Sequence, residues 1–216
     1  MKRLLCAVST FGFLGLATSV SFAADPYVDL GYDWSGFYAG AYAGYVWGNV
    51  DADVLAGGPS LDFDIKGVKV GALSGYNWQM DSWVFGLEHD TGFLDVDGVS
   101  AVSGGGQIND FDVETDGRIR ARIGWARDNF LPFVAGGLSL ANTDARVIGL
   151  GGGADSKWHV GFNIGAGVDV GITEHLVGRL EYIYDNYGNE RYTYPGGQID
   201  IDWDSHTVRA AAIWNF

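Results

Sequence analysis

The chain has 216 residues, with 13 Lys and Arg against 27 Asp and Glu, and its formal net charge is −14. This acidic balance argues against nucleic acid as a partner, because binding to nucleic acid depends on cationic contacts to phosphates. The 34 glycines, four prolines and 14% aromatic residues favour an all-β protein with many turns over a helical or disordered one.

The first 23 residues are predicted to be a cleaved signal peptide. A basic head at residues 2–3 precedes an apolar stretch at 4–20, and small residues occupy the positions that a signal peptidase reads. Cleavage is expected between Ala23 and Ala24. The alternative is an uncleaved membrane anchor, but the stretch is short and lacks a stop-transfer flank. Cleavage removes Cys6, the one cysteine, and leaves no thiol for disulfides, catalysis or metal binding.

Alternation with a period of two predicts β-strands along the rest of the chain. The clearest case is 157–170, where seven apolar residues alternate with seven charged, polar or glycine residues. Two further segments, 34–48 and 130–141, are apolar and glycine-rich, although their facing is less clear. The same alternation recurs in 67–80, 83–90, 113–125, 176–185 and 206–216. The expected number of strands is therefore eight.

The connections between these strands alternate in length. Short links follow the second, fourth and sixth strands, whereas long links follow the others, at 49–65, 93–111, 142–156 and 186–203. All short links then lie at one end, as in outer-membrane barrels. The sequence therefore predicts an eight-stranded antiparallel up-and-down transmembrane β-barrel with short periplasmic turns and four long extracellular loops.

The expected organisation is a short periplasmic segment at 24–33, followed by the outer-membrane barrel at 34–216. The alternative is a soluble eight-stranded barrel of the lipocalin type, in which the apolar register faces inward. Alternation alone does not decide between the two. Long apolar registers, Trp and Tyr near strand ends, and an apolar carboxyl end favour lipid on the outside.

If the apolar register faces lipid, the charged register faces the interior. That register holds seven basic and seven acidic residues, so the interior is predicted to be neutral. An eight-stranded barrel has room only for its own side chains, which favours a plugged polar core. The alternative is a narrow pore lined by arginines. The predicted network comprises Lys69, Glu88, Glu114, Asp116, Arg118, Arg120, Arg122, Asp169, Arg179, Glu181 and Arg209, and the same register also holds Asp90, Lys157 and Asp185.

We expect no enzyme activity, no cofactor and no metal site. Glu114 and Asp116 resemble an acid–base pair, but three arginines follow them on the same strand, which favours ion pairing. The four histidines do not have metal-ligand spacing, and no Gly-x-Ser-x-Gly motif is present. The predicted loops hold twelve acidic against two basic residues, which suits either a solvated surface or divalent cations shared with lipopolysaccharide phosphates.

The stretch Trp-Ser-Gly-Phe-Tyr-Ala-Gly at 34–40, with Gly44-Tyr45, the Ala24-Asp25 start and the closing aromatic, resembles a known family. These are the small outer-membrane β-barrel proteins of alphaproteobacteria, called immunogenic or porin-family proteins, of Brucella, Bartonella and rhizobia. The resemblance covers essentially the whole mature chain. It implies a Gram-negative outer-membrane location, contact with outer-membrane lipid and lipopolysaccharide, and a role in envelope integrity and at the cell surface.

The resemblance also implies that the barrel assembly machinery recognises the last strand through Trp214 and Phe216. The even number of strands itself predicts that this last strand closes the barrel against 34–48. Haemin binding among relatives makes a ligand at the extracellular side an alternative function, beside a narrow channel for small solutes. The candidate residues for haemin or a host ligand are aromatic and basic residues of the fourth predicted loop. They are Tyr187, Arg191, Tyr192 and Tyr194, for which an aromatic rim at the membrane boundary is the alternative.

Overall fold

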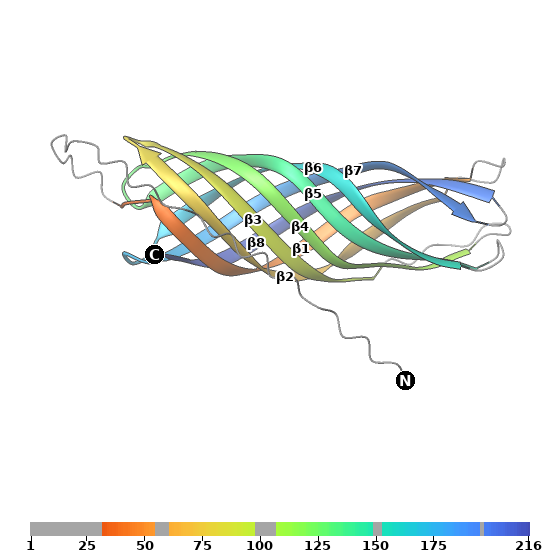
Figure 1. Cartoon of the computed structure of the whole chain (residues 1–216). Helices are drawn as coiled ribbons and strands as arrows, with labels where there is room; N and C mark the ends of the chain where they lie inside the picture. Colours follow the sequence, from red (N-terminus) through yellow and green to blue (C-terminus); the bar gives the residue numbers. More distant parts are fainter. Residues whose placement is uncertain (1–31, 55–60, 98–106, 149–152, 195–196) are drawn as a thin grey trace.

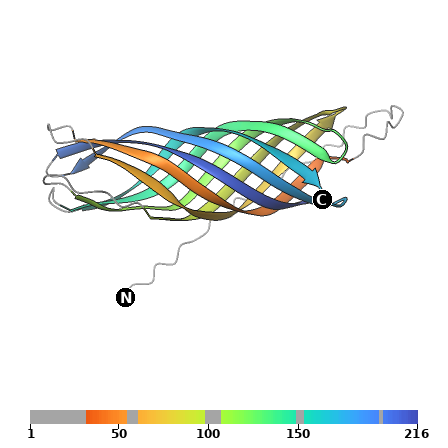
Figure 2. The same ribbon diagram turned by 180° about the vertical axis from the view of Figure 1, so that it is seen from behind.

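A computed structural model describes residues 32–54, 61–97, 107–148, 153–194 and 197–216. The predicted signal peptide, its cleavage site at Ala23 and Ala24, and most of segment 24–33 lie outside these residues. The described residues form eight antiparallel strands that pair in chain order into a closed barrel (Figures 1 and 2), which confirms the predicted fold. The strands are β1 (Gly36–Val54), β2 (Leu61–Met80), β3 (Trp83–Asp97), β4 (Gln107–Trp125), β5 (Phe130–Ile148), β6 (Gly153–Gly171), β7 (Leu176–Tyr194) and β8 (Gly197–Asn215).

The last strand closes the sheet against the first, as the sequence predicts. Tyr38 of β1 pairs with Asn215 of β8, and Val46 pairs with Thr207. Closure leaves no unpaired sheet edge, which is required of a sheet in lipid because hydrocarbon cannot satisfy backbone polar groups. The C-terminus therefore lies at the same end of the barrel as the start of β1 (Figure 1).

The strands are strongly staggered around the barrel. Following paired residues once around the sheet from Gly36 returns to β1 at Val46, a displacement of 46 − 36 = 10 residues. The path runs through Asn77, Gly86, Arg122, Ala135, Gly165, Ile183 and Thr207. Such a stagger requires the strands to tilt against the barrel axis, as Figure 1 shows. It also decides which residues of distant strands meet inside.

The strands extend further than the sequence indicates, so the predicted limits of the extracellular loops are wrong. Residues 49–54 and 61–65, predicted as loop, belong to β1 and β2, and 186–194 belongs to β7. In these segments the exposed residues are polar, as at Asn49 and Asp64, and the buried residues Val50 and Ile65 are apolar, so the pattern of apolar residues facing outward ends while backbone pairing continues. At the other end the turns are short, at 81–82, 126–129 and 172–175.

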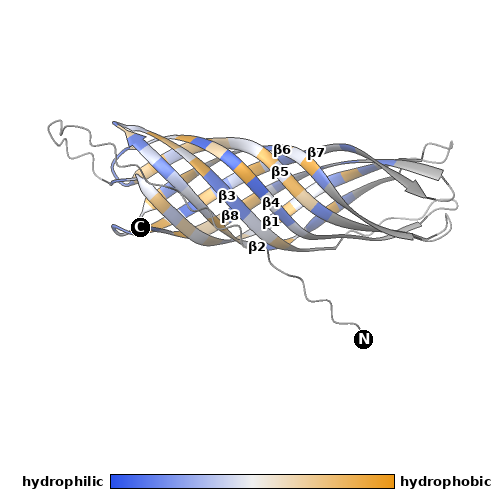
Figure 3. Cartoon of the chain, in the orientation of Figure 1, coloured by the Kyte–Doolittle hydropathy of each residue, from blue (hydrophilic) through white to orange (hydrophobic). Residues whose placement is uncertain are grey.

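The exposed face of the sheet is apolar and the buried face is polar. Along β6, Val160, Phe162 and Ile164 point outward and are 54–60% exposed, whereas Asn163 and Asp169 are buried. Orange and blue residues alternate along the ribbons in Figure 3 accordingly. A soluble barrel has the opposite arrangement, so the lipocalin alternative is excluded. Within the described ranges, no helix has the length and apolar character needed to cross a membrane.

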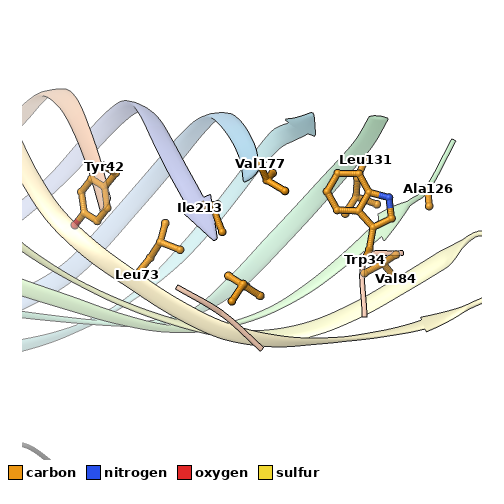
Figure 4. Close-up of a cluster of buried hydrophobic side chains, with 9 residues drawn as sticks. Trp34, Tyr42, Leu73, Val84, Ala126, Leu131, Val177 and Ile213 are labelled. Carbon is orange, nitrogen blue, oxygen red and sulfur yellow. The ribbon is translucent and has the colours of Figure 1, made fainter. Parts of the chain in front are cut away.

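An apolar cluster, called the floor here, fills the barrel end that carries the short turns. Figure 4 shows Trp34 beside Leu131, Val84 and Ala126, and Val177 and Ile213 belong to the same buried cluster. Trp34 precedes β1, and its backbone N–H donates to Gln79 Oε1 at 2.9 Å. A residue from outside the sheet therefore closes the lumen at this end.

The interior charge layer as the candidate functional site

A layer of charged side chains, called the charge layer here, occupies the middle of the lumen. It contains six basic and six acidic residues, each at most 4% exposed, so its formal charge is zero. The basic residues are Lys69, Arg118, Arg120, Arg122, Arg179 and Arg209, and the acidic residues are Glu88, Asp90, Asp116, Asp169, Glu181 and Asp185. The structure thus places ten of the eleven predicted network residues inside. The side chains of Glu114 and Lys157 lie outside the described residues.

Strand alternation explains how the sequence builds this layer. Every second residue of β4 from Asp116 to Arg122 points inward, which produces one acid and three arginines in a column. The pairing register between β3 and β4 then places a β3 carboxylate directly opposite two of these arginines. Glu88 pairs in register with Arg120, and Asp90 pairs with Arg118.

Glu88 lies at the centre of the charge layer. It forms ion pairs with Arg120 and Arg179, and Arg209 Nη2 lies 3.1 Å from its Oε1. The hydroxyl of Tyr38 donates to Glu88 Oε2 at 2.9 Å. One carboxylate therefore connects three arginines from three different strands.

The part of the charge layer farther from the floor is organised by Arg118. Its Nε and Nη2 donate to the two oxygens of Asp185 at 2.8 and 2.7 Å, and its Nη1 donates to Asp90 at 3.0 Å. Asp185 also accepts a hydrogen bond from Ser139 Oγ at 2.7 Å. Lys69 forms an ion pair with Asp116 beside this group. Two-pronged arginine–carboxylate contacts of this kind fix side-chain orientation as well as charge.

The part nearer the floor is organised by Asp169. Arg179 donates to it from Nε at 2.6 Å and Nη2 at 2.9 Å, and Arg122 donates from Nη2 at 2.7 Å. The two guanidinium groups lie over the ring of Phe133, 4.0 Å from the ring centre for Arg122 and 4.8 Å for Arg179. An aromatic face thus compensates for the proximity of two like charges.

The neutral members of the charge layer were not predicted as site residues. Tyr38, Phe133 and Ser139 occupy inward positions on β1 and β5. The corresponding sequence segments, 34–48 and 130–141, are rich in glycine and alanine, so their facing is difficult to read from alternation. The facing of β1 follows from its pairing with β8, because Arg209 faces inward and pairs with Gly44 of β1.

A second apolar cluster, called the lid here, lies on the other side of the charge layer. The rings of Tyr187 and Trp203 stack at 3.9 Å with an interplanar angle of 7°, and both residues are 3% exposed. Val50 and Ile65 are buried as well. The prediction that Tyr187 belongs to an extracellular ligand loop is therefore wrong. Tyr187 continues the inward register of Arg179, Glu181 and Asp185 on β7, and period two carries it into the lumen.

The remaining predicted site residues lie near the ends of β7 and β8. Arg191, Tyr192 and Tyr194 belong to β7, and their side chains lie outside the described residues, so ligand binding there stays a prediction. Trp214 and Phe216 point outward and are 49% and 76% exposed. Their recognition by the barrel assembly machinery likewise stays a prediction. Among the described residues, no group of three or more His, Cys, Asp or Glu side chains is placed to hold a metal.

Comparisons with known proteins agree with this architecture. The family model described as outer membrane protein beta-barrel domain matches residues 12–216. The chain is 30% identical over 191 residues to the 25 kDa outer-membrane immunogenic protein of Brucella abortus biovar 1 (strain 9-941), covering 86% of this chain and 80% of that protein. It is also 30% identical over 176 residues to the 22 kDa outer membrane protein of Rhizobium leguminosarum bv. viciae, covering 82% and 75%.

Among solved structures, the crystal structure of the outer membrane protein OprG from Pseudomonas aeruginosa is similar, with a TM-score of 0.57 at 12% identity. The match covers 87% of this chain and 98% of that chain. At this identity the likeness concerns the barrel fold alone.

Proposed function

Because this chain belongs to the outer membrane protein β-barrel family, together with the 25 kDa immunogenic protein of Brucella, we propose that it acts as a sealed structural component of the envelope. It is an integral β-barrel of a Gram-negative outer membrane with a buried salt-bridge network in its interior. A sealed barrel contributes to the integrity of the membrane and presents its outer end to the surroundings, without conducting solutes.

The observation that carries the proposal is that ion-paired side chains fill the lumen. A solute crossing the barrel would have to separate charges such as Glu88 and Arg120 that are shielded from water on both sides. Breaking a buried pair costs about 3–5 kcal/mol, because it leaves a charge uncompensated. The apolar floor around Trp34 and the lid around Trp203 add further barriers at the two ends.

Planar bilayer recording of the purified protein tests this proposal. We expect no reproducible unitary currents from the unmodified protein. Currents that change in size or selectivity when Arg120→Ala is introduced would overturn the proposal and favour a narrow pore lined by arginines. Arg127→Ala is the matched control, because it removes the same charge from an exposed turn outside the lumen.

Envelope integrity is tested in cells. A strain lacking the protein should become more sensitive to detergents, and the unmodified gene should restore resistance. A folded Arg120→Ala variant that restores less resistance than the unmodified protein would link the sealed interior to this role. Unchanged sensitivity of the strain that lacks the protein would count against a structural role.

We also propose that the outer ends of the strands are exposed at the cell surface. The name of the Brucella relative, an immunogenic protein, supports such exposure. Lys66 on β2 is exposed near this end, and Asp128 is exposed in a turn at the other end. Lys66→Cys should react with a membrane-impermeant maleimide on intact cells, whereas Asp128→Cys should react only after permeabilisation. The reverse pattern would invert the orientation of the barrel.

A further inference from the structure

A pocket of about 710 Å³ lies on the outer surface at the end of the barrel that carries the short turns. Its volume falls in the range of about 300–1,000 Å³ that is common for small-molecule sites. The residues that matter for its chemistry are Ser82, Trp125, Arg127, Asp128, Phe130 and Pro132. The pocket therefore lies between the turn at 81–82 and the turn at 126–129.

Backbone hydrogen bonds hold the two turns in a fixed relation. The N–H of Ala126 donates to the carbonyl of Ser82 at 2.7 Å, which ties one turn to the other. Within the second turn, Arg127 and Phe130 exchange N–H···O bonds of 2.9 and 3.0 Å. Side chains that project from this turn are therefore presented on a constrained backbone.

One wall of the pocket is apolar and faces the lipid. Trp125, the last residue of β4, is 57% exposed, and Phe130, the first residue of β5, is 46% exposed. Both share the outward register, as does Pro132, and Trp83 lies against Trp125 with ring centres 5.5 Å apart. Aromatic residues at strand ends mark the boundary between hydrocarbon and headgroups. The pocket thus lies at the level of the periplasmic headgroups.

The other side of the pocket carries one charge of each sign. Arg127 and Asp128 are both exposed, and within the described part of the chain neither forms an ion pair. Arg127 is also the one Lys or Arg among the described residues of this end, comprising 32–35 and the three turns, where Asp33, Asp81 and Glu174 are acidic. Arg127 would attract an anionic group of a ligand, and the acidic residues around it would attract a cationic group. This arrangement favours a ligand that carries one charge of each sign.

We propose that this pocket binds a glycerophospholipid of the periplasmic leaflet whose headgroup carries an ammonium group, such as phosphatidylethanolamine. Arg127 binds the phosphate, Asp128 binds the ammonium group, and the acyl chains lie against Trp125, Phe130 and Pro132. The charge order of the headgroup matches the adjacent cation and anion of the turn. The inference rests on the outer-membrane location of the chain and is independent of whether the lumen is sealed.

Native mass spectrometry in a mild detergent tests the site, with phosphatidylethanolamine added in equal amounts to each variant. Arg127→Gln should lower the retained lipid about tenfold, since a charge-assisted contact to phosphate is lost. Lys66→Gln is the matched control, because it makes the same charge change near the opposite end and should leave retention unchanged. Correct folding of each variant is checked by its faster gel migration when unboiled.

A second variant tests the role of the acidic residue. Asp128→Asn should reduce the preference for phosphatidylethanolamine over phosphatidylglycerol, because the latter lacks the ammonium group. Equal retention of phosphatidylethanolamine by the unmodified protein, Arg127→Gln and Lys66→Gln would overturn the proposal. Displacement of the lipid by inorganic phosphate alone, at equal concentration, would also overturn it by indicating a simple anion site.

Discussion

The charge layer and the two apolar clusters that flank it fill the same lumen by opposite means. In the charge layer six basic and six acidic side chains are buried to at most 4% exposure, and each is paired. In the floor and lid, buried rings and aliphatic groups pack without charges. Buried charges are tolerated only when their partners are present, whereas apolar groups contribute through the area and volume they fill.

The charge layer and the apolar clusters should therefore respond differently to substitution. The ion pairs depend on one another, because the single carboxylate of Glu88 forms ion pairs with three arginines. The apolar clusters shield the pairs from water, and low local polarity strengthens each contact. Loss of one charge should therefore disturb several neighbours, whereas loss of one apolar side chain should remain local.

The largest effect is expected for Glu88→Ala. This change leaves Arg120, Arg179 and Arg209 without their shared carboxylate and should lower the free energy of unfolding by about 3–5 kcal/mol. The measurement is urea unfolding of the detergent-solubilised protein, followed by the loss of fast gel migration. Glu174→Ala is the matched control, since Glu174 is exposed in a turn and should change stability by less than about 0.5 kcal/mol. Equal effects of the two variants would contradict the central role of Glu88.

A somewhat smaller effect is expected for Trp34→Ala in the floor. Trp34 is 2% exposed, and truncation of a buried tryptophan costs about 3 kcal/mol. Trp34 precedes β1 and forms no pair in the sheet, so the barrel of this variant should still close. We also expect no unitary currents from the variant in planar bilayers. Currents in this variant would show that the floor, and not the charge layer, is the barrier to conduction.

The direction of the charged side chains could be predicted from sequence, but most of their partners could not. Period two puts Arg118, Arg120 and Glu88 on the polar face of their strands, and the long apolar registers that favour lipid outside predict that this face points into the barrel. The contacts that cross the lumen, such as Arg118 with Asp185 and Glu88 with Arg179, depend on the ten-residue stagger between strands. Stagger is a property of the closed sheet and leaves no mark in the alternation of one strand.

Two other differences have separate physical causes. Tyr187 could have been placed correctly, since it continues the inward register of Asp185, but the predicted seventh strand ends at Asp185 and assigns Tyr187 to the loop at 186–203. The outer limits of the strands were not predicted, because beyond the apolar band the exposed positions become polar, as at Asn49 and Asp64, while the buried ones, Val50 and Ile65, are apolar. The floor was also not predicted, since Trp34 is the first residue of the predicted strand 34–48, whereas β1 begins at Gly36 and leaves Trp34 outside the sheet.

A double-mutant cycle on Lys69 and Asp116 measures how strongly one pair within the charge layer is coupled. Asp116→Leu removes the carboxylate that pairs with Lys69, and Lys69→Met leaves Asp116 with Arg118 as its remaining cation, so each should destabilise the protein. The double variant should be more stable than the sum predicts, with a coupling of about 1–3 kcal/mol in urea unfolding. Coupling near zero would indicate that Arg118, which lies 3.3 Å from Asp116, is its dominant partner instead.

The smallest effect is expected on the lipid-facing surface, where Trp78 is 48% exposed and its ring centre lies 4.8 Å from that of Tyr76. Trp78→Leu keeps an apolar side chain in contact with lipid and loses only the ring pair, so it should cost about 0.5–1.5 kcal/mol in urea unfolding. Trp34→Ala, by contrast, leaves a cavity that lipid cannot fill, because the lumen is closed. If Trp78→Leu destabilises the barrel as much as Trp34→Ala does, then packing against lipid contributes as much as packing inside the lumen. Apolar side chains on the lipid-facing surface would then contribute as much to the free energy of unfolding as apolar side chains inside the closed lumen.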